Sequence, residues 1–349
     1  MLVSVIVSLI RARLILPHND SNKLASIIIT VSLMAFGLTL TGCGKPVAKQ
    51  QANSIHRYVA DNLIDADLSS DAKIAVTLSH TRELSVWDNA SKSLLHQWQV
   101  ADFDEPTYLV SLSGNNQYLA VTGKHRVSIF DLNSGRLEVS WLAQGFDSDA
   151  SISSLYLNQN GKRVLLGMNE GSVISVDLEN KQLSMFQLHD GPVSHVEFIS
   201  YDEQILSAAH DGHALIWTSN NGQVIKDFSL PLRITSISFD AANRRLFIAD
   251  ALDNHLIADS HSAESIGHLS FLARYRYFRQ AIFVDRGKTL ITASSKQKII
   301  SWDISSGKKK KHWNITAFTA GTTVLDMAIN PSGQLITLSS DGALESWDY

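Results

Sequence analysis

The chain has 349 residues, with 30 Lys and Arg against 34 Asp and Glu and a formal net charge of −4. Its 44% hydrophobic residues exclude a disordered chain, and its single cysteine excludes a disulfide framework or a cysteine-based zinc cluster. The near-neutral charge argues against nucleic acid as a partner, because phosphate-binding domains usually carry a basic excess. The length fits two or three ordinary domains or one large repeat architecture.

The N-terminus has the parts of an export signal. An uncharged apolar run of 17 residues covers positions 24–40 after Lys23, and small residues follow it. The sequence Leu40-Thr41-Gly42-Cys43 resembles the bacterial lipobox, in which the chain is cut before the cysteine and its sulfur is acylated. A plain transmembrane helix is the alternative, and 17 residues is the short limit for crossing a bilayer.

The lipobox resemblance implies a signal peptide over residues 1–42 and a lipid anchor at Cys43. Residues 1–20 are either a start site placed too early or a long n-region. Gly44 follows the cysteine where Asp usually marks inner-membrane retention, so the resemblance implies the outer membrane, with the protein facing the periplasm. Residues 43–52 hold the anchor and an aperiodic tether that reaches up to about 30 Å.

From Thr77 onward one pattern recurs at intervals of 41 to 46 residues: alternating strands, polar turns, and an aromatic or aliphatic residue before Asp. The seven anchors are Trp87-Asp88, Phe130-Asp131, Val176-Asp177, Trp217-Thr218, Ala258-Asp259, Trp302-Asp303 and Trp347-Asp348. This period and its Trp-Asp signature resemble the WD40 β-propeller. The resemblance covers residues 53–349 and implies an all-β, seven-bladed propeller.

The fourth repeat matches the family pattern best. The resemblance implies that His189, Ser207, Asp211 and Trp217 form a buried hydrogen-bonded set, which is structural and not a catalytic triad. At the position of Asp211 the last repeat retains Asp341, but the five other repeats depart from the pattern, and we expect their blades to depend on apolar packing instead. The departures are Thr81, Lys124, Glu170, Leu252 and Lys296.

Large aromatic residues also recur ten residues beyond the anchors, on the expected outer strands. They predict packing between blades and not a carbohydrate or nucleobase platform. These residues are Trp98, Trp141, Phe228 and Trp313.

The last repeat stops at the end of a third strand and therefore lacks an outer strand. Residues 53–59 lie ahead of the first repeat and are not used by it. We expect them to complete the last blade and close the ring, because an open strand edge invites aggregation.

No motif for catalysis, metal or cofactor binding is present, so we predict no catalytic residue, no metal ligand and no cofactor. The pair His210 and His213 is explained by a turn. Inner-strand carboxylates are predicted at Asp65, Asp67 and Asp326, but no repeated set emerges from them. Enzymes and ligand sensors that use a central channel remain the alternative class.

Charged segments on the expected loops give the candidate interaction sites. Arg274, Tyr275 and Arg276 have the composition of interface hot spots, and we predict a partner site there. Across the same face Asp102, Asp104 and Glu105 form an acidic counterpart. Residues 308–311 are four lysines expected in a turn, either solvated or attracted to anionic lipid.

These features favour a monomeric scaffold for protein–protein interactions, held at the membrane through Cys43. The expected partners are unidentified envelope proteins, and a role in outer-membrane assembly or maintenance fits such a tethered propeller. Fold does not dictate function, so this expectation depends on analogy and on the absence of catalytic motifs.

Overall fold

The computed structural model describes residues 50–271 and 277–349. The expected signal peptide, Cys43 and most of the tether lie outside the described residues, and so do Arg274, Tyr275 and Arg276. In the part that is described, no helix is long and apolar enough to cross a membrane.

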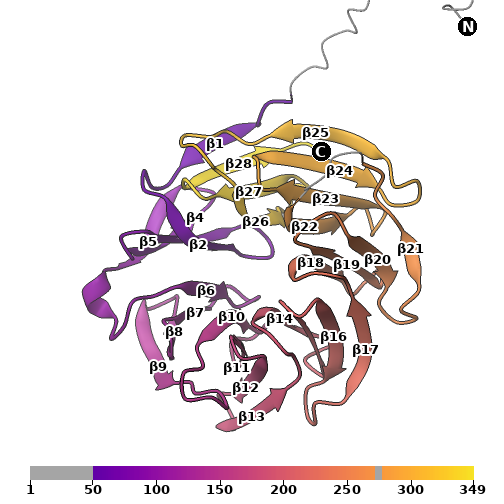
Figure 1. Cartoon of the computed structure of the whole chain (residues 1–349). Helices are drawn as coiled ribbons and strands as arrows, with labels where there is room; N and C mark the ends of the chain where they lie inside the picture. The colour runs from indigo at the N-terminus through magenta and orange to yellow at the C-terminus, as the bar shows by residue number, and fades with distance from the viewer. Residues whose placement is uncertain (1–49, 272–276) are drawn as a thin grey trace, which may run out of the picture. The chain divides into compact units, whose positions relative to one another are not determined.

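The described chain folds into seven antiparallel sheets of four strands each, arranged around a common centre as the blades of a propeller (Figure 1). Blade one contains β2 (Leu63–Leu68), β3 (Ile74–Ser79), β4 (Leu84–Asp88) and β5 (Ser93–Trp98). A 3-10 turn, η1 (Val100–Asp102), leads to blade two, which contains β6 (Leu109–Leu112), β7 (Tyr118–Thr122), β8 (Arg126–Asp131) and β9 (Arg136–Leu142).

Blade three contains β10 (Ile152–Leu157), β11 (Arg163–Met168), β12 (Ser172–Asp177) and β13 (Gln182–Gln187). Blade four contains β14 (Val193–Ile199), β15 (Gln204–Ala209), β16 (His213–Thr218) and β17 (Val224–Ser229). Blade five contains β18 (Ile234–Asp240), β19 (Arg245–Asp250), β20 (His255–Asp259) and β21 (Ser265–Gly267).

Blade six contains β22 (Phe278–Val284), β23 (Thr289–Ser294), β24 (Lys298–Asp303) and β25 (Lys309–Asn314). Blade seven contains β26 (Val324–Ile329), β27 (Leu335–Ser339) and β28 (Ala343–Trp347), and its fourth strand is β1 (Ser54–Arg57). The predicted all-β, seven-bladed fold is confirmed.

The ring closes through the N-terminal strand, as predicted. β1 runs antiparallel to β28, with Ser54 opposite Ser346 and Arg57 opposite Ala343. Directly after β1, the Tyr58 ring stacks on Trp87 of blade one with ring centroids 4.7 Å apart. The end of β1 therefore also contacts the first blade.

The core is divided among the seven contacts between neighbouring blades. Each of seven buried apolar clusters combines the second and third strands of one blade with residues of the next. Those middle strands are almost continuously apolar because both of their faces are covered, whereas the outer strands are largely exposed. The four outer-strand aromatics lie in or against these clusters, as predicted from their spacing.

In five blades the Asp that follows the anchor residue stabilises the turn to the outer strand. The Asp131 carboxylate accepts hydrogen bonds from the amide and hydroxyl of Ser134, and Asp303 does the same with Ser306. These bonds lower the pKa of both carboxyl groups. Gly135 and Gly307 complete the same turns at φ of 70° and 65°, a region that glycine enters without strain.

One detail of the strand assignment was wrong. The four lysines of residues 308–311 were expected in a turn, but β25 begins at Lys309. Only Lys308 lies in the turn, and Lys309, Lys310 and Lys311 begin the outer strand of blade six, all with exposed side chains.

Candidate functional site

The two faces of the propeller have different loops. We call the connector face the side that holds the segments between blades and the turns between second and third strands. The turn face is the opposite side, with the other two turns of each blade. Antiparallel pairing within every blade fixes this division.

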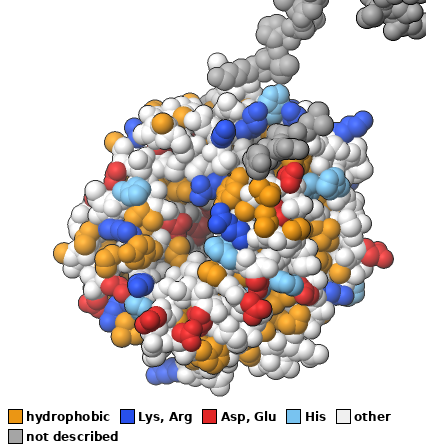
Figure 2. Space-filling model, in the orientation of Figure 1, with side chains coloured by type: hydrophobic (Ala, Val, Ile, Leu, Met, Phe, Trp, Pro, Cys, Tyr) orange, Lys and Arg blue, Asp and Glu red, His pale blue; other side chains and the backbone are white. Residues whose placement is uncertain are grey.

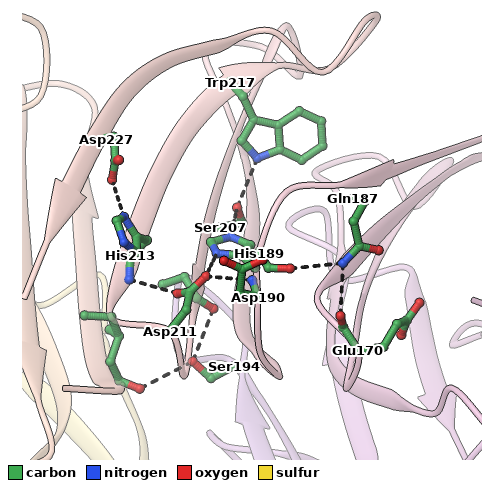
Figure 3. A network of polar contacts seen from close by, with 12 residues as sticks. Glu170, Gln187, His189, Asp190, Ser194, Ser207, Asp211, His213, Trp217 and Asp227 are labelled. Atoms are coloured by element: carbon green, nitrogen blue, oxygen red, sulfur yellow. Dashed lines mark hydrogen bonds and ion pairs between the residues drawn. The ribbon is translucent and has the colours of Figure 1, made fainter. Parts of the chain in front are cut away.

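The polar set of blade four joins its strands to the connector face (Figure 3). Trp217 Nε1 donates to Ser207 Oγ at 3.0 Å, and Ser207 Oγ lies 2.8 Å from His189 Nε2. His189 Nδ1 in turn lies 3.0 Å from Asp211 Oδ2. Burial lowers the pKa of His189, which keeps the ring neutral. Ser207 is fully buried, so no substrate reaches this hydroxyl, and the set holds the loop in place.

The bond from the anchor Trp recurs in other blades. The indole of Trp87 donates to Thr77, that of Trp302 to Thr292 and that of Trp347 to Thr337, at 2.9 to 3.1 Å. The acceptor lies ten residues before the Trp each time, on the neighbouring middle strand and two residues along from the residue opposite the Trp. This repeated bond explains why the repeats combine a Trp with a Ser or Thr at that spacing.

The blades that depart from the Asp pattern do not depend on apolar packing alone, which corrects the prediction. A carboxylate binds the corresponding turn in four of them: three use an acidic residue from another position, and the third blade uses Glu170 at the Asp position itself. Asp61 accepts from the amide and hydroxyl of Thr81, Glu105 from the amide of His125, Glu170 from the hydroxyl of Ser172, and Asp250 from the amide of Leu252.

A second repeated set, which the sequence analysis missed, lies at the centre of the ring. In every blade a polar side chain of the inner strand bonds to the backbone of the next inner strand. Asp65 accepts from Val110 N, Asp67 from Leu112 N, Ser111 from Leu157 N and Asp326 from Leu68 N. Ser153 donates to Val193 O, Ser194 to Ile234 O, Thr235 to Phe278 O and Gln280 to Leu325 O.

Three of these bridging residues are the inner-strand carboxylates predicted above, and the fold brings them to one side of the channel. Asp67 and Asp326 share a side-chain hydrogen bond. Burial raises the pKa of Asp65 to about 7 and that of Asp326 to about 6, and it raises the pKa of Asp67 well above its ordinary value. A carboxylate surrounded by other carboxylates and little water holds its proton more tightly.

These carboxylates line a central cavity of about 590 Å³. Figure 2 shows the molecule hollowed near the centre of the ring, where acidic side chains are visible. Tyr156 and His195 also line the cavity, and its lining includes no Lys or Arg. Across the described residues, no group of three or more His, Cys, Asp and Glu side chains is arranged to hold a metal ion.

Exposed apolar side chains distinguish the two faces. Sixteen large hydrophobic residues are exposed in the described chain. Nine lie on outer strands and one, Tyr201, lies on the turn face. The remaining six are in loops of the connector face: Val100, Tyr108, Phe146, Leu232, Leu252 and Phe318.

Arginine guanidinium groups cover two of the connector-face rings. Arg82 lies 4.1 Å from the ring centroid of Tyr108, and Arg57 lies 4.6 Å from that of Phe318. Both guanidinium groups also donate to backbone carbonyls, Arg57 to those of Asp341 and Ala60, and Arg82 to that of Thr107, which holds them in place over the rings. The connector face therefore offers preformed Arg–aromatic contacts at two places.

The three predicted acidic partner residues lie in the connector between blades one and two. Asp104 has a side chain that is 74% exposed and pairs with Arg126 at 3.1 Å. Glu105 is half-buried and bonded to backbone amides, as described above, so its carboxylate already has partners within the fold. Asp102 accepts from the amide of Gln99 at the 3-10 turn. Of the three, Asp104 is the side chain most available to a partner.

Residues 180–218, from β13 to the end of β16, match the family model described as WD domain, G-beta repeat. The fold is a seven-bladed β-propeller of the WD40 type. Among solved structures it is similar to a chain in the crystal structure of the mitotic checkpoint complex, at 17% identity and a TM-score of 0.70. That similarity covers 88% of this chain and 95% of the other, and it concerns the fold alone. A search of curated proteins finds no match to this sequence.

Proposed function

We propose that this WD40-type propeller is a protein-interaction scaffold whose connector face binds a protein partner in the cell envelope. The observation that carries the proposal is the distribution of exposed apolar residues, six on the connector face against one on the turn face. Exposed apolar residues rimmed by polar ones are typical of protein-binding surfaces. Aromatic and Arg side chains also dominate the energy of such interfaces.

The envelope location is the part of the proposal that depends on the lipobox resemblance. Acylation of Cys43 and cleavage before it would hold the protein at the outer membrane on the periplasmic side. Radiolabelled palmitate should enter the wild-type protein and not the Cys43→Ser variant. Equal labelling of the two proteins would contradict the anchor.

The interaction site is tested by paired substitutions on the two faces. Tyr108→Ala with Phe318→Ala removes both rings of the Arg–aromatic contacts, whereas Tyr201→Ala removes the fully exposed ring of the turn face. Affinity capture from solubilised envelopes should lose its main partner with the first variant and keep it with the second. Unchanged melting temperatures for both variants would show that the loss is not due to unfolding.

A second candidate function uses the central cavity. Carboxylates with raised pKa values in a cavity are typical of catalytic or ligand-binding sites, which would make the protein an enzyme or a small-ligand sensor. We favour the structural role, because a backbone amide of the neighbouring blade already bonds each of the three carboxylates. A ligand of the cavity would change the NMR signals of the inner-strand amides, and a partner on the connector face would not.

A further inference from the structure

Residues 52 and 53, directly before β1, contact blades six and seven. The amide of Asn53 bonds to Ser346 O, and Ala52 packs in the apolar cluster that includes Trp313 of β25 and Trp347 of β28. Ser346 is near the end of β28, the third strand of blade seven, and in each of the six other blades the third strand ends at the turn face. The tether therefore leaves the turn face at the junction of blades six and seven.

A concentration of basic side chains lies beside this exit. It consists of exposed residues in the two turn-face turns of blade six and at the start of β25, and we call it the basic corner. Its members are Arg286, Lys288, Lys308, Lys309, Lys310 and Lys311.

The acidic residues near the basic corner are few. Asp285 lies 3.5 Å from Lys310 Nζ, and Asp303 is engaged with Ser305 and Ser306 of its own turn. At the tether exit, Asp348 accepts a hydrogen bond from Gln334. With the anchor Asp counted, the turn-face turns and outer-strand starts of blades one and three hold as many acidic as basic residues, and those of blades two, four, five and seven hold more acidic ones. In a chain with a net charge of −4, the basic excess of blade six is therefore a local feature.

We propose that the basic corner docks on the anionic surface of the membrane to which the protein is tethered. This inference rests on the proposed lipid anchor. Cys43 lies seven residues before Gln50, which allows a separation of at most about 25 Å. The tether thus keeps the basic corner near the headgroups, and electrostatic attraction acts over about 10 Å at 0.1 M salt.

Docking at this corner also orients the propeller. The basic corner and the tether exit lie at the turn-face ends of neighbouring outer strands, and the connector face lies at the opposite ends. A membrane-docked corner would turn the Arg–aromatic contacts of Tyr108 and Phe318 away from the bilayer. The same docking that immobilises the propeller would leave its partner-binding face open to the periplasm.

The test measures how close the corner lies to the headgroups in the lipidated full chain. Ser305→Cys supplies a labelling site in the blade-six turn, because acylation blocks the only native cysteine. Ala317→Cys supplies the matched site on the connector face next to the same blade. Each labelled protein is reconstituted into phosphatidylcholine vesicles with and without 30% phosphatidylglycerol, with an acceptor dye on the headgroups.

Energy transfer from position 305 should be about twofold higher with phosphatidylglycerol, and 0.5 M NaCl should abolish the increase. The increase should be absent from a triple variant of the corner, which carries Lys308→Gln, Lys309→Gln and Lys311→Gln. It should persist in a control variant of the same net charge, which carries Lys73→Gln, Lys124→Gln and Lys181→Gln. Lys310 is left intact because it bonds to Thr289. Equal transfer in the two lipids, or an increase that survives loss of the three corner lysines, would overturn the proposal.

The outcome separates this inference from the anchor itself. If the wild-type protein does not float with pure phosphatidylcholine vesicles in 0.5 M NaCl, it is not lipidated, and this result contradicts the anchor. A protein that floats there but shows no preference for phosphatidylglycerol at position 305 retains the anchor and loses the docking surface. Inorganic phosphate at 5 mM in the low-salt buffer should leave the energy transfer unchanged. If the corner were instead a site for free phosphate, the added phosphate would saturate it and the increase would be lost.

Discussion

The carboxylate of Asp326 in blade seven accepts a hydrogen bond at 2.7 Å from the backbone amide of Leu68 in blade one. The ring is thus closed near the channel by this bond and at the rim by the pairing of β1 with β28. The first closure joins blade seven to blade one, and the second completes blade seven with an N-terminal strand. Closure of this kind leaves no blade incomplete, which matters because an unpaired strand edge promotes aggregation.

Deletion of residues 53–59 should severely destabilise the propeller. It removes β1, exposes the edge of β28, and removes the Tyr58 hydroxyl that bonds to Asn89 of blade one. We expect the melting temperature to fall by more than about 10 °C with visible aggregation, because several kcal/mol of pairing and packing are lost. Deletion of residues 45–49, ahead of β1, is the control and should melt like the wild type. An unchanged melting temperature in the first deletion would contradict this closure.

Ser207→Ala should destabilise blade four by about 1–3 kcal/mol, because it leaves the buried Trp217 Nε1 and His189 Nε2 without their partner. Ser207→Thr is the matched control, since a Thr at the equivalent position accepts the indole hydrogen bond of Trp87, Trp302 and Trp347. Chemical denaturation measures both. If alanine and threonine were equally tolerated, the bonds would not stabilise the blade.

The central carboxylates should make stability fall as pH rises. Because folding raises the pKa of Asp67 above the unfolded value of about 3.9, the folded state binds the proton more tightly. Its contribution is full below about pH 4. It is lost as pH rises from there through the raised folded-state pKa of Asp67. The neighbouring Asp326 and Asp65 lose their contributions as pH rises through about 6 and about 7.

Asp67→Asn keeps an acceptor for the Leu112 amide and removes the titration. Relative to wild type, its free energy of unfolding should rise between pH 5 and pH 8, because wild type loses the contribution of the Asp67 proton over this range and the variant does not. Asp147→Asn, in the exposed connector before blade three, is the control. His189, whose pKa is lowered, contributes to the pH dependence of stability with the opposite sign. Its contribution cancels when the free energy of unfolding of the variant is compared with that of wild type at each pH. Parallel stability curves for Asp67→Asn and wild type would contradict the coupling.

Glu105→Ala should lower the stability of the fold more than Asp104→Ala does, although the two residues are adjacent. Glu105 is half-buried and holds backbone amides at the start of β8, so its loss should cost about 1–2 kcal/mol. Asp104 makes an exposed ion pair with Arg126, a type of pair that contributes about 0–1 kcal/mol. Thermal denaturation distinguishes them, and equal losses would show that Glu105 does not hold the turn.

The sequence is sufficient for most of the fold. Its period of 41 to 46 residues and its Trp-Asp anchors predict seven blades, and the missing last strand predicts the closure by residues 53–59. These features depend on local pattern and on counting. The buried set of His189, Ser207, Asp211 and Trp217 follows from the resemblance, and the structure gives its geometry.

The interactions between blades could not be predicted in the same way. Asp61 and Glu105 replace a missing Asp from about 20 residues earlier in the chain, so the repeat alignment does not reveal them. The bridging residues at the channel differ in type from blade to blade, from Asp65 to Ser153 to Gln280. What they share is a place on an inner strand beside the next blade, which becomes apparent once the strands are placed in space.

The most direct test of the scaffold function is photo-crosslinking in cells. A photoreactive amino acid replaces Tyr108 on the connector face, and in a parallel protein it replaces Tyr201 on the turn face. The account predicts one discrete crosslinked envelope protein from position 108 and none from position 201. A partner captured only from position 201, or no discrete product from position 108, would contradict binding through the connector face.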